Sequence, residues 1–331
     1  MKQILQRLLN YQTLGKEEAK DILMKISKGE FGDFEVTAFI TIYLMRSITI
    51  DELTGFREAL LELAHPVNLH TNELIDIVGT GGDGKNTFNI STLSCFVCAG
   101  AGHKVAKHGN YGASSICGAS NVMENLGYKF TNDSVQLQRQ LDSANICFLH
   151  APLFHPALKT VGPMRKELGL RTFFNMLGPL VNPSRPQYQL IGVYNLEMAR
   201  IYQYLLEQSG HDFTVVHALD GYDEISLTGD THVTTAKGIE IYTPQALGSA
   251  QIDSSTIIGG NTVSEAKSIF IKILEGKGSK EQNSVVCANA AFALLLTGKY
   301  KDYEEAFHTA TNSLQQGKAL NALHQLLATQ I

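Results

Sequence analysis

The sequence predicts a small all-helical N-terminal domain followed by a large α/β domain with a mainly parallel central sheet and flanking helices. Over roughly the first 65 residues, apolar side chains recur only at helical spacing. From residue 74 onward, short apolar runs alternate with helical stretches, and this alternation builds a parallel sheet with helices on its faces. A length of 331 residues accommodates one large and one small domain.

The composition is that of a folded enzyme, with 44% hydrophobic and 18% charged residues. A net charge of −5 argues against a nucleic-acid partner. We find neither a signal peptide nor an apolar run of transmembrane length, so no membrane partner is expected. Five irregularly spaced cysteines argue against a disulfide framework and favour a reducing compartment. We therefore expect a cytoplasmic protein.

The N-terminal domain, residues 1–68, is predicted to contain four short helices. The first three follow from apolar residues at helical spacing, which are Leu5, Leu8 and Leu9, then Ala19, Ile22, Leu23 and Ile26, then Phe39, Ile40, Tyr43 and Leu44. Thr49 and Glu52 form a capping box that begins a fourth helix, running to about residue 63. Small helical units of this kind often dimerise through an apolar face, so we expect a homodimer.

The second domain, residues 69–331, is predicted to alternate strands and helices. Strands are expected at residues 74–78, 103–106, 146–149, 188–193 and 213–217, and helices at 91–102, 156–168 and 196–208. A β-hairpin over 231–241 and two or three helices from about residue 264 complete the chain. Residues 285–296 are apolar nearly all round, which indicates a buried helix.

A glycine-rich loop, Gly79-Thr80-Gly81-Gly82-Asp83-Gly84, directly follows the first strand and precedes a helix that opens with Asn89-Ile90-Ser91-Thr92. Glycines let the backbone approach a phosphate, and the helix start offers unpaired amides and a positive dipole end. A tight strand-to-helix turn with its cap at Ser91 or Thr92 is the plainer interpretation. The P-loop signature and the dinucleotide fingerprint are both missing, so the loop predicts a phosphate site of another kind.

The segment GTGGDGKNTFNIST, residues 79–92, closely resembles the phosphoribosyl-pyrophosphate loop of the anthranilate phosphoribosyltransferase family. The resemblance continues in further blocks that follow the family's order: Lys107-His108-Gly109-Asn110, His155-Pro156, Arg165, residues 175–183 and residues 220–225. The N-terminal helices also fit the family's small domain. Several long motifs in register are far more specific than a single glycine-rich loop.

The resemblance implies transfer of the 5-phosphoribosyl group from phosphoribosyl pyrophosphate to anthranilate, giving N-(5-phosphoribosyl)anthranilate and pyrophosphate, in tryptophan biosynthesis. It implies Mg²⁺ as cofactor, a homodimer, and a helical domain completed by a segment near residues 160–185. The leaving group is stable and highly charged, so catalysis needs positioning and charge neutralisation more than a nucleophile. No general base is assigned; Asn110 and Arg165 are expected to position the substrates.

The resemblance assigns donor binding to Gly79, Gly82, Asp83, Thr87, Asn89, Ile90, Ser91, Thr92, Lys107, His108, Gly109, Asn110, Ser114 and Ser115. It assigns anthranilate binding to Gly79, Asn110 and Arg165, and Mg²⁺ binding to Ser91, Asp223 and Glu224. Without the motifs, the carboxylate pair would be an exposed acidic turn and Arg165 a surface arginine paired with Glu167 or another acid. His108 and His155 either border the aromatic pocket or are structural. Cys95 and Cys98 are expected to be buried core residues rather than a metal or redox pair.

The segment after Asn110 departs from the family. Tyr111 stands where arginine is expected, Ser115-Ile116-Cys117-Gly118-Ala119 where a Ser-Lys-Ser-Gly-Ser-like stretch is expected, and Asn121 where aspartate is usual. Each lost charge-assisted hydrogen bond is expected to weaken donor binding by about 1.5–3 kcal/mol. Two other functions therefore remain open: a related phosphoribosyltransferase or phosphorylase with another aromatic acceptor, and a non-catalytic paralogue that binds nucleic acid.

Overall fold

The computed structural model describes residues 1–112 and 117–330, and the chain divides into two compact units. Residues 1–67 and 151–185 form the first, here called the helical unit, and residues 68–150 and 186–331 form the second, the α/β unit. The helical unit is thus built from two separate stretches of the chain. Within the described ranges, no helix is long and apolar enough to cross a membrane.

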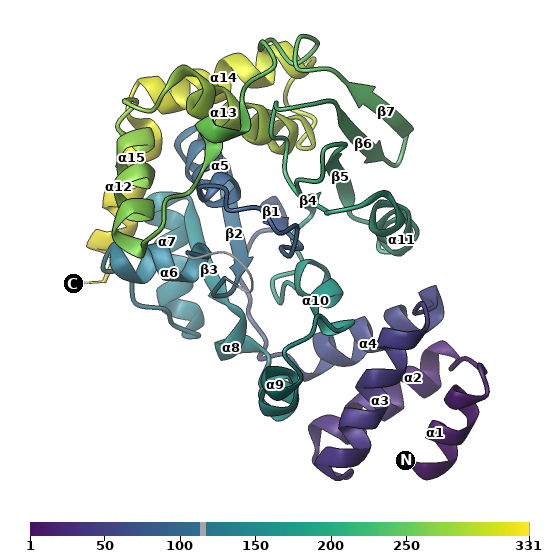
Figure 1. Cartoon of the computed structure of the whole chain (residues 1–331). Coiled ribbons are helices and arrows are strands. Elements are labelled where there is room, and N and C mark those ends of the chain that lie inside the picture. The colour runs from purple at the N-terminus through teal and green to yellow at the C-terminus, as the bar shows by residue number, and fades with distance from the viewer. Residues whose placement is uncertain (113–116, 331) are drawn as a thin grey trace. The chain divides into compact units, whose positions relative to one another are not determined.

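The helical unit contains the four predicted N-terminal helices (Figure 1). They are α1 (Lys2–Leu9), α2 (Lys16–Ser27), α3 (Asp33–Met45) and α4 (Ile50–Leu63), followed after residue 150 by α8 (Ala151–Phe154), α9 (Pro156–Leu168), α10 (Phe174–Leu177) and the 3₁₀ turn η1 (Gly178–Leu180). The capping box of α4 is confirmed: Thr49 Oγ1 accepts from Glu52 N at 3.2 Å, and Glu52 Oε2 accepts from Thr49 N at 2.9 Å. Helix α9 packs against α2, α3 and α4, so the second stretch shares their core.

A cluster of aromatic rings joins the two stretches of the helical unit. Phe173 stacks on Phe56 with ring centroids 4.7 Å apart, and it meets Tyr43 edge-on at 5.0 Å. Phe39 completes the cluster from α3. Aromatic side chains bury large areas and favour such stacked and edge-on pairs, so this cluster is a major source of stability for the unit.

The α/β unit is built on a seven-stranded sheet in the order β3-β2-β1-β4-β5-β6-β7 (Figure 1). Its strands are β1 (Leu74–Gly79), β2 (Lys104–Gly109), β3 (Ile146–His150), β4 (Tyr188–Gly192), β5 (Asp212–Ala218), β6 (Thr231–Thr235) and β7 (Gly238–Tyr242). The first five run parallel, and β6 and β7 form the predicted antiparallel hairpin. The predicted fold class is confirmed. Strand β2 extends three residues beyond its predicted end, which places Lys107 and His108 inside the sheet.

Eight α-helices in the described part of this unit accompany the sheet. They are α5 (Ile90–Gly100), α6 (Ala119–Asn125), α7 (Ser134–Ala144), α11 (Leu196–Glu207), α12 (Val263–Leu274), α13 (Lys280–Leu295), α14 (Tyr303–Gln315) and α15 (Lys318–Ala328), with a 3₁₀ turn η2 (Ser254–Ile257). Helix α13 is buried, as its apolar sequence predicted, and it packs against α5 and α14. All five cysteines are buried and free, and Cys95 and Cys98 lie in α5 as core residues.

The prediction of two or three C-terminal helices was wrong, because four are present. Ser279 and Asp302 each cap a new helix by accepting from the backbone amide three residues on. Gly317, with φ +70°, lies in the two-residue break between α14 and α15. The two-residue break between α14 and α15 is too short for apolar spacing alone to reveal it.

The strand order places a topological switch point between β1 and β4. From β1 the chain proceeds outward through β2 to β3, and it then returns to the other side of β1 and continues outward through β4 and β5. Ligands of open α/β sheets bind outside the carboxyl ends of the strands at such a point. These ends are Gly79 of β1 and Gly192 of β4, which are paired in register.

Candidate active site

The glycine-rich loop lies at the switch point. Gly81, Gly82 and Gly84 have φ of +64°, +79° and +76°, a region that only glycine adopts readily. Thr80 N donates to Gly192 O at 2.9 Å, so the loop begins by pairing with the end of β4. The helix cap is Asn89, earlier in the chain than the predicted alternatives Ser91 and Thr92.

Asp223 and Glu224, here called the acid pair, rest on this loop although they lie about 140 residues further along the chain. They belong to the irregular segment between β5 and β6. Asp223 Oδ2 accepts from Gly81 N at 2.6 Å, and Glu224 Oε1 accepts from Ser91 N at 3.1 Å. Two amides expected to be unpaired for phosphate are therefore held by carboxylates, and the pair is not an exposed acidic turn.

The close seat of the acid pair depends on two glycines at the strand ends. A Cβ atom on Gly79 would lie 2.4 Å from Asp223 Oδ2, and one on Gly192 would lie 1.6 Å from Asp223 O. The first contact involves a side chain, whereas the second involves backbone that has no freedom to turn away. Gly192 is therefore a requirement of the site, and its only signal in the sequence was a glycine at the end of a strand.

Replacing Gly192 with alanine is expected to lower the melting temperature and abolish activity, because the segment carrying the acid pair must shift. Overpacking of this kind destabilises by about 1–3 kcal/mol or more. The matched control is Gly162→Ala, where a Cβ would meet nothing within 4 Å. Thermal unfolding checks both variants, and a Gly192→Ala protein as stable and active as Gly162→Ala would contradict the described contact.

Three carboxyl groups, those of Asp223, Glu224 and Asp83, interact closely at this site. Burial raises the pKa of Asp223, and the neighbouring Asp83 carboxylate raises it further. The pKa of Glu224 is raised well above its ordinary value by burial and by repulsion from Asp223 and Asp83. Such a site stabilises a bound cation, since a cation offsets both the repulsion and the lost hydration.

Lys107 is the buried cation beneath this site. Its side chain is 2% exposed, and Nζ donates to Ile77 O at 2.6 Å and to Ser91 Oγ at 3.4 Å. It also lowers the pKa of Glu224 by its charge. The structure therefore places Lys107 next to the helix start and the acid pair, and not at a solvated strand end.

The carboxylates suit Mg²⁺ better than a metal that needs a complete protein cage. No three metal-binding side chains among the described residues converge closely enough to hold an ion by themselves. Mg²⁺ is commonly held by one or two carboxylates together with water and substrate phosphate. Asp223, Glu224 and the hydroxyl of Ser91 supply such an incomplete set, which a phosphate ligand would complete.

The other donor-site candidates differ in accessibility. Ile90 and Thr92 are buried, so only their backbone is available to a ligand. His108 is 3% exposed inside β2, which favours the structural interpretation of this histidine. Asn110 is exposed directly after β2, and its Oδ1 accepts from the next backbone amide at 2.8 Å. Ser114 and Ser115 lie outside the described residues.

Asn289 is a further residue of the site that sequence reasoning missed. It is buried in α13, where Oδ1 accepts from Ile225 N at 3.1 Å and Nδ2 donates to Ile225 O at 2.9 Å. Ile225 directly follows the acid pair, so this amide fixes the backbone that carries Glu224. A single asparagine within an otherwise apolar helical run was the available signal.

Arg165 lies in the helical unit, in the last turn of α9. Its Nη2 donates to Asn175 Oδ1 at 3.3 Å, and its guanidinium lies 5.3 Å from the centre of the Phe174 ring. Burial lowers its pKa. In the described part of the chain it forms no ion pair, so the alternative of pairing with Glu167 is wrong and its charge remains available to an anion.

The burial of His155 favours the structural interpretation of this histidine. Its side chain is 1% exposed at the start of α9, and the backbone of Val181 and Leu60 offsets part of the effect of burial on its pKa. Burial lowers its pKa to about 4.

The burial of His155 predicts a pH dependence of stability. The unfolded chain takes up this proton near pH 6.5, whereas the folded chain does so only near pH 4, so wild type loses stability as the pH falls through this range. The advantage of wild type over His155→Gln in unfolding free energy should shrink by about 2–3 kcal/mol between roughly pH 7.5 and 4.5. Urea titrations at both pH values measure it, and a constant difference would contradict the assignment.

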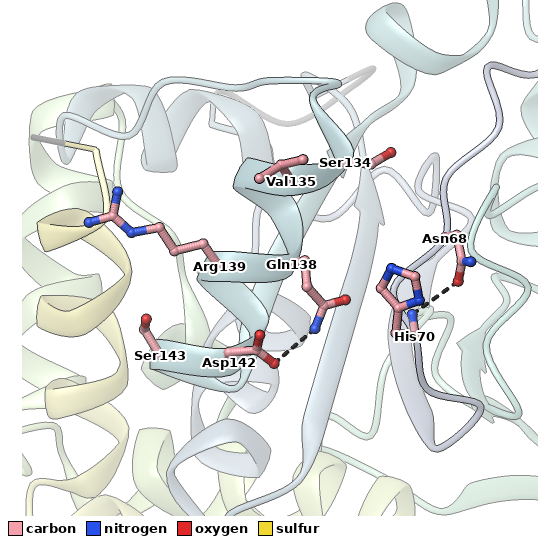
Figure 2. A pocket seen from close by; sticks show the side chains of 8 residues that line it. All are labelled: Asn68, His70, Ser134, Val135, Gln138, Arg139, Asp142 and Ser143. Carbon is pink, nitrogen blue, oxygen red and sulfur yellow. Dashed lines mark hydrogen bonds between the residues drawn. The ribbon is translucent and has the colours of Figure 1, made fainter.

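A separate hollow of about 460 Å³ lies between residues 68–70 and helix α7 (Figure 2). Within it, Gln138 Nε2 donates to Asp142 Oδ1 at 2.8 Å and His70 N donates to Asn68 Oδ1 at 3.0 Å. The guanidinium of Arg139 extends away from His70 and Asn68 (Figure 2). None of the predicted site residues lines this hollow, so it is not the candidate active site.

Known proteins match both units of the chain. Residues 2–64 match the glycosyl transferase family, helical bundle domain, and residues 71–320 match the glycosyl transferase family, a/b domain. Anthranilate phosphoribosyltransferase of Flavobacterium johnsoniae is 56% identical over 98% of both chains.

Solved structures agree with the sequence relatives. The anthranilate phosphoribosyltransferase of Thermus thermophilus superposes with a TM-score of 0.92 at 31% identity and 98% coverage of both chains. That of Saccharomyces cerevisiae, in complex with PRPP and Mg, gives 0.91 at 28% identity, covering 98% of this chain and 96% of that one. The chain therefore belongs to the anthranilate phosphoribosyltransferase family, which confirms the predicted family and enzyme class.

Proposed function

We propose that the acid pair, the glycine-rich loop and Lys107 bind the Mg²⁺ complex of phosphoribosyl pyrophosphate, and that Arg165 binds the carboxylate of anthranilate. Family membership supplies the reaction, anthranilate phosphoribosyl transfer in tryptophan biosynthesis. The observation that carries the proposal is the seat of Asp223 and Glu224 on the amides of Gly81 and Ser91, at the switch point of the sheet.

The proposed donor site brings carboxylates for Mg²⁺ and the positive charge of Lys107 close together. Asp223, Glu224 and Ser91 would hold Mg²⁺, which supplies charge neutralisation on the pyrophosphate when bound. Lys107, already next to Ser91, adds a fixed positive charge below the loop. The positive φ of Gly82 and Gly84 lets the loop turn its backbone toward the same region. The protein thus stabilises the departing pyrophosphate without a covalent intermediate.

Arg165 is the residue proposed to bind the carboxylate of the acceptor. A guanidinium binds a carboxylate through two parallel hydrogen bonds, which fixes both the position and the orientation of a planar ligand. Arg165 is partly buried, lies near the Phe174 ring and lacks an ion-pair partner in the described chain. Asn110, exposed at the end of β2, is proposed to orient the reacting amine toward the donor.

The experiment that tests this function follows the loss of anthranilate fluorescence with phosphoribosyl pyrophosphate and Mg²⁺. We expect a loss that requires both the donor and the metal, and equimolar release of pyrophosphate. Replacing anthranilate with benzoate, which lacks the amine, should give no pyrophosphate. A folded protein that consumes no anthranilate at saturating concentrations of both substrates would overturn the proposal.

We also propose that the chain is a homodimer joined through α3. Phe34, Ala38, Thr41 and Met45 form an exposed stripe along α3 at helical spacing, and it carries no charge. Phe34 is 93% and Met45 84% exposed, so the stripe leaves large apolar side chains in water. A second copy of the chain would cover it.

Phe34→Glu is expected to turn the dimer into a monomer, because a carboxylate would be buried at the interface. Sedimentation velocity measures the change directly. Leu196→Glu is the matched control, since Leu196 is an exposed leucine on α11. A wild-type protein that sediments as a monomer, or a Phe34→Glu dimer as stable as wild type, would contradict this interface.

The state of the cysteines bears on the cellular compartment. The five cysteines are all free and buried, and burial raises the pKa of Cys95, Cys98, Cys117, Cys147 and Cys287. Such thiols are compatible with a reducing environment and need no disulfide. We propose that the chain acts in the cytoplasm.

A further inference from the structure

Tyr111, Gly112, Gly118 and Asn121 form a contact, here called the neck, between residues 111–112 and 118–121. Two of these residues, Tyr111 and Asn121, differ from those expected in the family. One side-chain oxygen holds both sides of it: Asn121 Oδ1 accepts from Gly112 N at 3.2 Å and from Gly118 N at 3.0 Å. A Cβ atom on Gly118 would lie 2.1 Å from Gly112 N, so the two backbones touch. The neck is therefore a defined contact, although the groups that close it are uncharged.

Tyr111 is tied to the neck by its own side chain. Its hydroxyl donates to Glu124 Oε1 at 2.8 Å, and its ring meets His150 edge-on with centroids 4.9 Å apart. His150 is 6% exposed and stacks on Phe130 at 4.4 Å. An exposed tyrosine is thus held at both its ring and its hydroxyl.

Helix α6 supplies the groups that hold the neck. Ser120 Oγ lies 2.9 Å from His150 Nδ1, Asn121 caps both glycine amides, and Glu124 accepts from Tyr111. Asn121 and Glu124 thus bond directly to neck residues, and Ser120 contacts the histidine against which the Tyr111 ring packs.

Cys117, the residue that precedes Gly118 of the neck, contacts the helix start that follows the glycine-rich loop. Asn89 Nδ2, at the cap of α5, donates to Cys117 O at 2.8 Å. Asn110, next to Tyr111 in sequence, has its Oδ1 fixed by Tyr111 N at 2.8 Å. Displacement of the neck would therefore displace two groups proposed to contact the donor.

We infer that Tyr111 and Asn121 are positioning residues for phosphoribosyl pyrophosphate: their uncharged side chains hold the neck against the start of α5 by hydrogen bonds, where an arginine and an aspartate are expected in the family. The inference rests on the proposed function. Tyr111 and Asn121 therefore do not weaken donor binding; they fix Asn110 and Asn89 by uncharged hydrogen bonds. The effect falls on the donor more than on the acceptor, because Asn89 is proposed to contact only the donor, whereas Asn110 is proposed to serve both substrates.

The test measures KM for each substrate, kcat and the melting temperature in paired variants. Asn121→Ala removes the shared acceptor, and Asn121→Asp retains it. Tyr111→Phe keeps the ring on His150 and loses only the bond to Glu124. We expect KM for phosphoribosyl pyrophosphate to rise at least roughly tenfold in Asn121→Ala and about threefold to tenfold in Tyr111→Phe, with a smaller rise in KM for anthranilate through Asn110. Asn121→Asp should restore most of the donor affinity.

Controls separate positioning from general damage. Tyr204→Phe and Asn321→Ala remove the same groups from exposed helical sites and should change neither KM. Calorimetric titration of Mg²⁺–phosphoribosyl pyrophosphate without acceptor gives a second reading of donor affinity. Unchanged donor affinity in both Asn121→Ala and Tyr111→Phe would overturn the inference, as would a parallel loss of both KM values and of stability that Asn121→Asp fails to repair. A wild-type protein that does not bind the donor would instead overturn the proposed function.

Discussion

Replacing Asp223 with asparagine is expected to lower kcat at saturating Mg²⁺ by roughly 100-fold or more while making the metal-free protein more stable. The new amide side chain can still accept from the amide of Gly81, and its NH₂ group can donate toward Asp83, where wild type has two repelling carboxylates. Relief of a buried like-charge contact typically adds about 0.5–2 kcal/mol of stability. Unfolding by urea without metal, together with the fluorescence assay, measures the two opposite effects.

The pH dependence of this effect follows from the raised pKa values. Asp223 and Glu224 hold protons in the folded state at pH values where the unfolded carboxyls have lost them, so metal-free wild type loses stability as the pH rises above about 4. Added Mg²⁺ should remove most of this loss. Asp142→Asn, an exposed acid on α7, is the control and should change neither quantity. A stabilised Asp223→Asn protein with full activity would show that the acid pair does not hold the metal.

Replacing Arg165 with alanine is expected to raise KM for anthranilate by about 100-fold and to leave KM for the donor within about twofold. The guanidinium offers a bidentate contact to a carboxylate, and hydrogen bonds to charged groups contribute about 1.5–3 kcal/mol each. Its only described hydrogen bond within the protein is to Asn175, so stability should change little. Steady-state kinetics with each substrate varied in turn gives the two KM values.

Two variants sharpen the test of Arg165. Arg165→Lys keeps the charge but loses the planar fork, so it should recover only part of the anthranilate affinity. Lys166→Ala removes an exposed neighbouring charge from the same helix and should have no effect. An Arg165→Ala protein whose two KM values rise together would indicate that the residue organises the fold and does not bind the acceptor.

Local patterns were sufficient for much of the fold. The Thr49–Glu52 capping box, the alternation of strands and helices and the apolar run of α13 each reflect interactions within one stretch of chain. Helices α6 and α7 were not predicted. Helix α6 has only seven residues, and its polar side chains face the neck, so it shows no continuous apolar stripe. The number of C-terminal helices was underestimated because only two residues separate α14 from α15, so the two helices resemble one in the sequence.

The site was less predictable, since its geometry depends on contacts between distant residues. Motifs identified the acid pair and the glycine-rich loop, but no local signal shows that Glu224 accepts from Ser91 N across 133 positions. The roles of Gly192 and Asn289 follow only from what packs against them. The loss of charge at Tyr111 and Asn121 predicted weak donor binding, whereas the structure shows a closed hydrogen-bonded neck at those positions.

Binding of the metal–donor complex by the acid pair is tested most directly by an anomalous diffraction map of crystals grown with phosphoribosyl pyrophosphate and with Mn²⁺ as a substitute for Mg²⁺. We expect an anomalous peak bonded to a carboxylate oxygen of Asp223 or Glu224 and to the pyrophosphate, with the phosphates against the start of α5. Pyrophosphate bound elsewhere, with Asp223 and Glu224 still paired to Gly81 N and Ser91 N and no metal beside them, would contradict it.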